Sequence, residues 1–193
     1  NNLGSIIAWE GDVAKAEGYF QECLEACREI GNNRLMATSL YNLATVATQR
    51  HAYADARRLY EEALALAKYS NDHVSAAMTY AAIAETYNAE HRYEEARVAA
   101  EEGFTFANKS ERAEGRAYCQ WHLGDALSGL GRHGEALASF RAALTEALAL
   151  QDPKLAASVM LSVADLRRRE GNASYARAVL ASVIAHPPDA VVA

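Results

Sequence analysis

A shift of the sequence by 40 residues aligns the chain with itself from end to end without a gap. One position of the repeat is Ala in every copy, at Ala16, Ala56, Ala96, Ala136 and Ala176. A larger apolar residue recurs with the same period, at Leu3, Leu43, Ile83, Leu123 and Val163. Self-similarity at a fixed period of this length indicates a repeat architecture, in which each unit packs mainly against its neighbours.

The spacing inside each unit is helical, because apolar residues recur at i, i+3, i+4 and i+7 and so share one face. Two breaks interrupt each unit. The first falls at Gly11, His51, His91, Gly131 and Gly171, where Gly suits the left-handed position that ends a helix. The second falls at Asn32, Asp72, Arg112 and Asp152, where Asn or Asp can cap the next helix. Each unit is therefore predicted to be a helix A, a tight turn, a helix B and a short loop.

This pattern predicts an all-α fold, a right-handed superhelical α-solenoid of antiparallel helix pairs. The expected helices cover residues 1–10, 13–30, 34–50, 53–69, 74–90, 93–108, 114–130, 133–150, 154–170 and 173–186. They form a single array over residues 1–193, with units at 1–32 (truncated), 33–72, 73–112, 113–152 and 153–190. Since the chain does not begin with Met, we expect it to be a fragment of a larger protein.

Charge and composition exclude several classes of function. The 25 acidic residues outnumber the 19 basic ones, which argues against direct nucleic-acid binding, since such surfaces need clustered Lys and Arg. No run of about 18 apolar residues is present, so we expect no membrane span. The cysteines Cys23, Cys27 and Cys119 form no disulfide framework, which favours the cytoplasm.

A sequence motif accompanies the repeat. Leu-Gly is followed by Ala twelve residues after the Gly, by an aromatic residue four later and by a small residue three after that. It reads Leu123-Gly124, Ala136, Phe140 and Ala143 in the fourth unit. It resembles the tetratricopeptide repeat, although the period of that family is usually about 34 residues. The longer period and the segment 60–67 are similar to the helical arrays of large bacterial ATP-dependent signalling regulators, including relatives of the maltose-regulon activator. Long repeats of this kind also occur in peptide-sensing bacterial regulators and in animal polarity adaptors.

The resemblance implies that helix A of each unit lines a concave groove. Its groove positions correspond to i, i+4, i+7 and i+8 of each helix A. The resulting candidate binding residues are Tyr41, Thr45, Gln49, Glu85, Asn88, Trp121, Asp125, Ser128, Asp165, Arg168 and Arg169, together with Asn1, Ser5, Ala8 and Trp9 in the first unit. The clamp for chaperone tails is not expected, because Asn42 matches one of its positions but Tyr41 stands where it needs Lys.

Some candidate residues have a second interpretation. Trp121 can pack between neighbouring A helices instead of contacting a ligand, and the run Arg167-Arg168-Arg169 can be a solvated helix end. Cys23 and Cys27 offer two metal ligands, but a structural zinc site needs four, so we interpret them as packing residues. No nucleophile–base arrangement or phosphate loop is recognisable. We therefore expect no metal, no cofactor and no enzymatic activity.

The sequence favours a protein- or peptide-binding scaffold, expected to be the sensor or partner-docking domain of a multidomain bacterial regulator. The alternative is an architectural or autoinhibitory array that controls an attached ATPase or an oligomer. Expected partners are a protein or peptide ligand, other domains of the same chain, and further copies that associate through uncapped ends. We expect a basic part of the ligand near Glu85 and Asp125 and an acidic group near Arg168 and Arg169.

Overall fold

The computed structural model describes residues 13–110 and 112–185, and this part of the chain is helical without any strand. The helices are α2 (Val13–Glu29), α3 (Asn33–Gln49), α4 (Tyr53–Tyr69), α5 (His73–Ala89), α6 (Tyr93–Ala107), α7 (Ala113–Gly129), α8 (His133–Ala149), α9 (Pro153–Arg169) and α10 (Ala173–Ala185). The predicted all-α solenoid of antiparallel helix pairs is confirmed. The expected helix at 1–10 lies outside the described residues.

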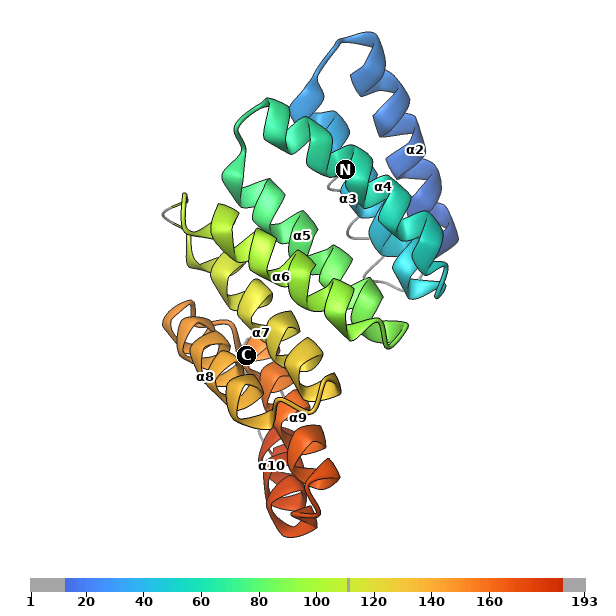
Figure 1. The fold of residues 1–193 in the computed structure, drawn as a ribbon. Coiled ribbons are helices and arrows are strands. Elements are labelled where there is room, and N and C mark those ends of the chain that lie inside the picture. Colours follow the sequence, from blue (N-terminus) through green and yellow to red (C-terminus); the bar gives the residue numbers. More distant parts are fainter. Residues whose placement is uncertain (1–12, 111, 186–193) are drawn as a thin grey trace.

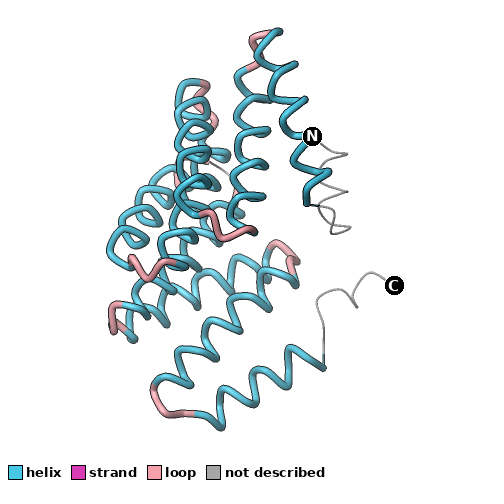
Figure 2. The backbone as a smooth tube through the Cα atoms, turned by 90° about the vertical axis from the view of Figure 1, so that its right-hand side faces the viewer, coloured by secondary structure: helices cyan, strands magenta, loops and turns pink. Residues whose placement is uncertain are grey.

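Successive helices form antiparallel pairs, α3 with α4, α5 with α6, α7 with α8 and α9 with α10 (Figure 1). A view from the side shows the pairs stacked along an arc (Figure 2). In Figure 1 the helices α4, α6 and α8 lie in front of α3, α5 and α7. The array thus has two long faces. We call the face formed by α3, α5, α7 and α9 the inner face and the face formed by α4, α6 and α8 the outer face.

A left-handed residue ends almost every helix at an interval of 20 residues. Positive φ angles occur at Gly31, His51, Asn71, His91, Gly131, Gln151 and Gly171. The amide of His51 donates to the carbonyl of Thr48, and the amide of the following residue donates to the carbonyl of Ala47. This bonding satisfies carbonyl groups that the end of a helix would otherwise leave without donors. The predicted turn positions at residues 51, 91, 131 and 171 are therefore confirmed, including the two occupied by His.

Short polar side chains begin the A helices, as predicted. Asn32, Asp72 and Asp152 each accept a hydrogen bond from the backbone amide three residues later, at 3.0 to 3.1 Å. Such a bond satisfies one of the free amides of the first helical turn. Arg112 precedes α7 but makes no side-chain capping hydrogen bond, unlike the residues that precede the other described A helices.

The core follows the repeat. Of the alanines that recur every 40 residues, those at positions 16, 56, 96 and 136 have no exposed surface, and Ala176 is 4% exposed. The aromatic position four residues later is also buried at Phe20, Tyr60 and Phe140. A side chain at Gly124 would meet the Phe140 ring at 2.5 Å, which explains the small residue of the Leu-Gly pair. The fifth copy differs, because Leu180 on α10 is 41% exposed and no described helix follows it.

Candidate functional site

The inner face contains three adjoining cavities, which together we call the inner groove. Each cavity lies where the A helices of neighbouring units meet. They extend from Tyr41 on α3, past Glu85 on α5 and Trp121 on α7, to Asp165 on α9. The first two cavities share lining residues, and the third begins one helical turn further along α5 and α7, so predicted residues from four units line one row of cavities.

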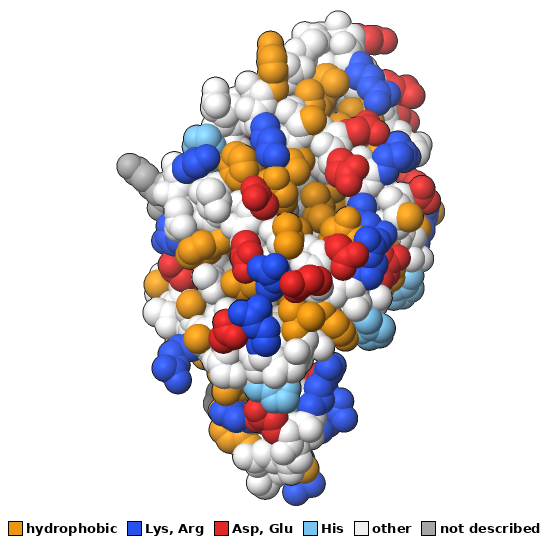
Figure 3. Space-filling view, viewed as in Figure 1, with side chains coloured by type: hydrophobic (Ala, Val, Ile, Leu, Met, Phe, Trp, Pro, Cys, Tyr) orange, Lys and Arg blue, Asp and Glu red, His pale blue; other side chains and the backbone are white. Residues whose placement is uncertain are grey.

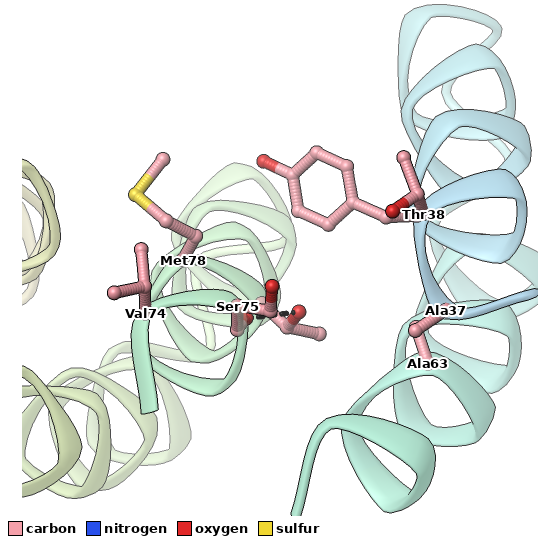
Figure 4. A pocket seen from close by; sticks show the side chains of 8 residues that line it. Ala37, Thr38, Ala63, Val74, Ser75 and Met78 are labelled. Carbon is pink, nitrogen blue, oxygen red and sulfur yellow. Dashed lines mark hydrogen bonds between the residues drawn. The ribbon is translucent and has the colours of Figure 1, made fainter. Parts of the chain in front are cut away.

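The first cavity separates α3 from α5 and has a volume of about 210 Å³ (Figure 4). Ala37 and Thr38 line it from one side, and Val74, Ser75 and Met78 line it from the other. Tyr41 also contributes to its wall, and its ring lies 5.3 Å from the ring of Tyr60. Burial, with the nearby Tyr60 and Glu85, raises the pKa of the Tyr41 phenol. Its hydroxyl group therefore stays protonated and available as a hydrogen-bond donor.

The second cavity shares Tyr41 and Met78 with the first and has a volume of about 170 Å³. Its other lining residues include Glu85 on α5 and two aromatic side chains of α7, Tyr118 and Trp121. Glu85 is exposed, so its carboxylate is accessible at the edge of an aromatic pocket. This combination suits a ligand segment with an apolar side chain next to a basic one.

Trp121 packs against a neighbouring A helix and also lines the inner groove, the two interpretations that the sequence left open. Its indole nitrogen donates to the hydroxyl of Ser162 on α9 at 2.9 Å, and its ring stacks on His122 at 4.5 Å. The bond to Ser162 connects α7 with α9, whereas the stacking on His122 is within α7. The residue nevertheless remains partly exposed and lines the second cavity, so part of its ring is accessible from the groove.

The third cavity is polar and has a volume of about 210 Å³. Asn88, Asp125, Ser128 and Asp165 line it, as predicted from their positions on successive A helices. The Asn88 amide nitrogen donates to the carbonyl of His122 at 2.9 Å, but its buried oxygen Oδ1 has no donor within the described part of the chain. A buried acceptor without a donor is energetically unfavourable, so a ligand N–H group at this point would be stabilising.

The two arginines among the predicted groove residues are already paired with a carboxylate of the chain. Arg168 and Arg169 both bind the carboxylate of Asp165, each at 2.6 Å. Burial alone would raise the pKa of Asp165, but the hydrogen bond from Arg168 and the charge of Arg169 hold it below its usual range. An acidic ligand group would therefore have to compete with Asp165 for these guanidinium groups.

Three predicted residues line none of the three cavities: Thr45, Gln49 and Arg168. The hydroxyl of Thr45 donates to the carbonyl of Tyr41 and lies 3.2 Å from the hydroxyl of Tyr60, so it faces helix α4. Gln49 is exposed at the end of α3 and lines none of the three cavities. The first-unit candidates Asn1, Ser5, Ala8 and Trp9 lie outside the described residues.

The sequence prediction missed Met78 and Tyr118. Each lies three residues before the first groove position, i, of its helix A, which is Ala81 in the third unit and Trp121 in the fourth. Residues at i and i+3 are neighbours on a helix surface, so the signal was present in the same spacing. Extending the groove positions by one turn toward the amino end of each helix A would have included both residues.

The cysteines are free thiols. The sulfur atoms of Cys23 and Cys27 lie 3.9 Å apart, and Cys119 is fully buried. A hydrogen bond with Ser39 lowers the pKa of Cys23, whereas burial raises the pKa of Cys27 and raises that of Cys119 to about 12. Within residues 13–110 and 112–185 no group of three or more His, Cys, Asp or Glu side chains is placed to hold a metal ion. None of the described helices is long and apolar enough to cross a membrane.

Comparisons with known proteins agree with this architecture. A family model described as tetratricopeptide repeat matches residues 1–68 and 36–109. A sequence search of curated proteins found no significant match. Among solved structures, the Rap protein in complex with Competence and Sporulation Factor superimposes with a TM-score of 0.79 at 16% identity, covering 92% of this chain.

Two further structures have the same fold. The apo form of RapI has a TM-score of 0.73 at 19% identity, and BtubC (BKLC) from P. vanneervenii has a TM-score of 0.73 at 16% identity. Both alignments cover 92% of this chain. The chain spans 49% of the Rap protein, 62% of RapI and 74% of BtubC. At these identities the likeness establishes the fold alone.

Proposed function

The chain belongs to the tetratricopeptide repeat family, and we propose that it is a scaffold that binds a segment of a protein or a peptide in the inner groove. The observation that carries the proposal is the row of three cavities along the A helices, from Tyr41 to Asp165. They combine accessible aromatic surface with carboxylates, the mixture that dominates many peptide-binding surfaces. The role is one of binding and not of catalysis, as is general for scaffolds of this family.

The charges of the groove favour a ligand with a basic part. Glu85 is exposed beside the second cavity, and Asp125 lines the third with only His122, at 3.6 Å, as an ion-pair partner among the described residues. Asn88, whose buried Oδ1 has no donor among the described residues, lines the same cavity. A Lys or Arg side chain of the ligand would supply both a positive charge and N–H donors.

The wider setting that we propose is a sensor or partner-docking domain of a multidomain bacterial regulator in the cytoplasm. The likeness in fold to the Rap protein, which was solved with a bound factor, supports a ligand-sensing role. Free thiols at all three cysteines are compatible with a reducing compartment. Similarity to the arrays of maltose-regulon activator relatives belongs to this proposal and rests on the repeat length and the segment 60–67.

The groove can be tested with an array of random peptides probed by the purified chain. Peptides that bind are then titrated against Trp121→Ala, Asp125→Asn and, as a control, Tyr69→Ala, which removes an aromatic ring that is 79% exposed on the outer helix α4. We expect Trp121→Ala to weaken binding by about 2 kcal/mol, Asp125→Asn to weaken binding of basic peptides most, and Tyr69→Ala to be silent. Equal affinities for all three folded variants would exclude the inner groove as the binding site.

A further inference from the structure

We propose that the outer face carries a second binding surface, a groove between α4 and α6 that accepts an amphipathic helix of another protein with apolar side chains flanked by Lys or Arg. We call it the outer groove and define it by Leu64 on α4, Tyr80, Ile83 and Tyr87 on α5, and Val98 on α6. It shares no residue with the inner groove, so it does not depend on the function proposed above.

The outer groove is large and its floor is apolar. Its volume is about 580 Å³, larger than that of each cavity on the inner face. Figure 3 shows apolar side chains gathered between α4 and α6, with acidic and basic side chains around them. Val98 is 49% exposed on one wall although it lies next to buried Ala99. A hollow with accessible apolar surface and a polar rim is typical of an interaction site.

The charge of the groove indicates the kind of partner. Every charged side chain that lines it is a glutamate, Glu61 on α4 and Glu94, Glu95 and Glu102 on α6. Arg97 binds Glu94 at 2.9 Å and Arg92 binds Glu95 at 2.8 Å. Neither Glu61 nor Glu102 has an ion-pair partner within the described ranges. One unpaired carboxylate therefore stands on each wall, which favours a partner with cations on both sides of an apolar stripe.

Aromatic rings at the two ends of the floor already hold cations of the chain itself. The Tyr87 ring lies between the guanidinium groups of Arg57 and Arg92, each 4.6 Å from its centre. The ammonium group of Lys68 lies 4.9 Å from the ring of Tyr80 and donates to its hydroxyl at 2.7 Å. These contacts occupy the rings of Tyr80 and Tyr87 and leave the apolar surface between them, around Ile83 and Val98, for the partner.

The shape favours a helix over an extended segment. Tyr80 and Tyr87 are seven residues apart on α5, so the floor is two helical turns or about 10 Å long. That length matches side chains at i, i+3, i+4 and i+7 of a docked helix. An extended segment gains most of its affinity from main-chain hydrogen bonds to a sheet edge. The walls here are helices, whose main-chain groups are already bonded internally, so they offer no such edge.

The test uses a fluorescently labelled synthetic helical peptide of Leu and Lys, with a Leu and Glu peptide of the same pattern for comparison. Binding is measured by anisotropy on the 193-residue chain. The variant Val98→Arg fills the groove with a bulky cation, and Leu148→Arg makes the same change at a residue that is 64% exposed on α8. A double variant, Glu61→Gln with Glu102→Gln, removes two exposed carboxylates from the outer groove. Its control is the double variant Glu22→Gln with Glu25→Gln, which removes two exposed carboxylates from α2.

We expect the Leu and Lys peptide to bind and the Leu and Glu peptide not to bind. Val98→Arg and the Glu61→Gln, Glu102→Gln pair should each weaken binding about tenfold, while both matched controls leave it unchanged. Circular dichroism checks that each variant is folded. Absence of binding to the unmodified chain would overturn the proposal. An equal loss of binding in the matched controls would also overturn it, because binding would then reflect only the net charge of −6. The inner groove is tested separately, by the effects of Trp121→Ala and Asp125→Asn on the peptides that the array selects.

Discussion

The indole nitrogen of Trp121 on α7 donates a hydrogen bond to the hydroxyl of Ser162 on α9 at 2.9 Å, so two neighbouring A helices are joined on the surface proposed to bind ligand. The bond orients an aromatic ring that also lines the second cavity of the inner groove. Groove shape and the stacking of units are therefore coupled at this residue.

Ser162→Ala tests that coupling. Loss of the hydroxyl removes the bond to Trp121, and we expect a decrease of about 1 kcal/mol or less in the free energy of unfolding. Chemical denaturation followed by circular dichroism measures it. Ser128→Ala is the matched control, because Ser128 also lines the groove but contributes no hydrogen bond to Trp121. If both variants unfold at the same denaturant concentration, the bond adds nothing to stability.

Ala136→Leu tests the close packing of each helix pair. Ala136 has no exposed surface, so a larger side chain must displace its neighbours, and we expect destabilisation of about 1–3 kcal/mol. Glu61→Ala, on the surface of α4, should change stability by less than about 0.5 kcal/mol. Similar melting temperatures for the two variants would contradict the assignment of buried and exposed faces.

The left-handed turns predict opposite effects for two substitutions. Gly131 has a φ of 74° with open space around it, so Gly131→Ala should destabilise by about 1 kcal/mol through backbone strain alone. Gln151 has a φ of 55°, and Gln151→Gly should relieve strain there and stabilise by up to about 1 kcal/mol. Thermal denaturation gives both values. Changes of the same sign would show that side-chain contacts, and not the backbone angle, decide stability at these turns.

Asp72 should make stability depend on pH. Burial opposes ionisation of its carboxyl group, but hydrogen bonds from the amide and hydroxyl of Ser75 outweigh it and lower the pKa. Because the folded state has the lower pKa, the stabilisation is complete above the unfolded value of about 3.9 and is lost as the pH falls through the folded value. Asp72→Asn retains a capping oxygen but cannot titrate. The advantage of the unmodified chain over this variant should be constant near neutral pH and shrink below about pH 4 in urea titrations, and an advantage that persisted in acid would refute the assignment.

The repeat predicted most of the fold because its signals are local. An alanine every 40 residues, an Asn or Asp before a helix and a Gly or His after one each act within a turn or two of the chain. These residues settled the helix boundaries and the buried positions. The pairing of Arg168 and Arg169 with Asp165 was equally local, since the spacings are i, i+3 and i, i+4, and it could have been recognised from the sequence.

The relations between units were not predictable in the same way. The bond from Trp121 to Ser162 depends on how far one pair is rotated against the next, which no spacing within a unit reports. The same rotation opens the cavity between α3 and α5 and the outer groove between α4 and α6. Both grooves thus arise from contacts between units, where the sequence pattern specifies burial but not angle.

The left-handed residues that recur every 20 positions have a consequence for how such a chain can change in length. Each joint is closed by carbonyl–amide bonds within a few residues, as between His51 and Thr48, and needs nothing from distant units. A duplicated stretch that begins and ends at equivalent joints, such as residues 33–72, would carry its own closures with it. The array can therefore gain or lose whole units, and each such change alters the distance between its two ends by the length of one unit.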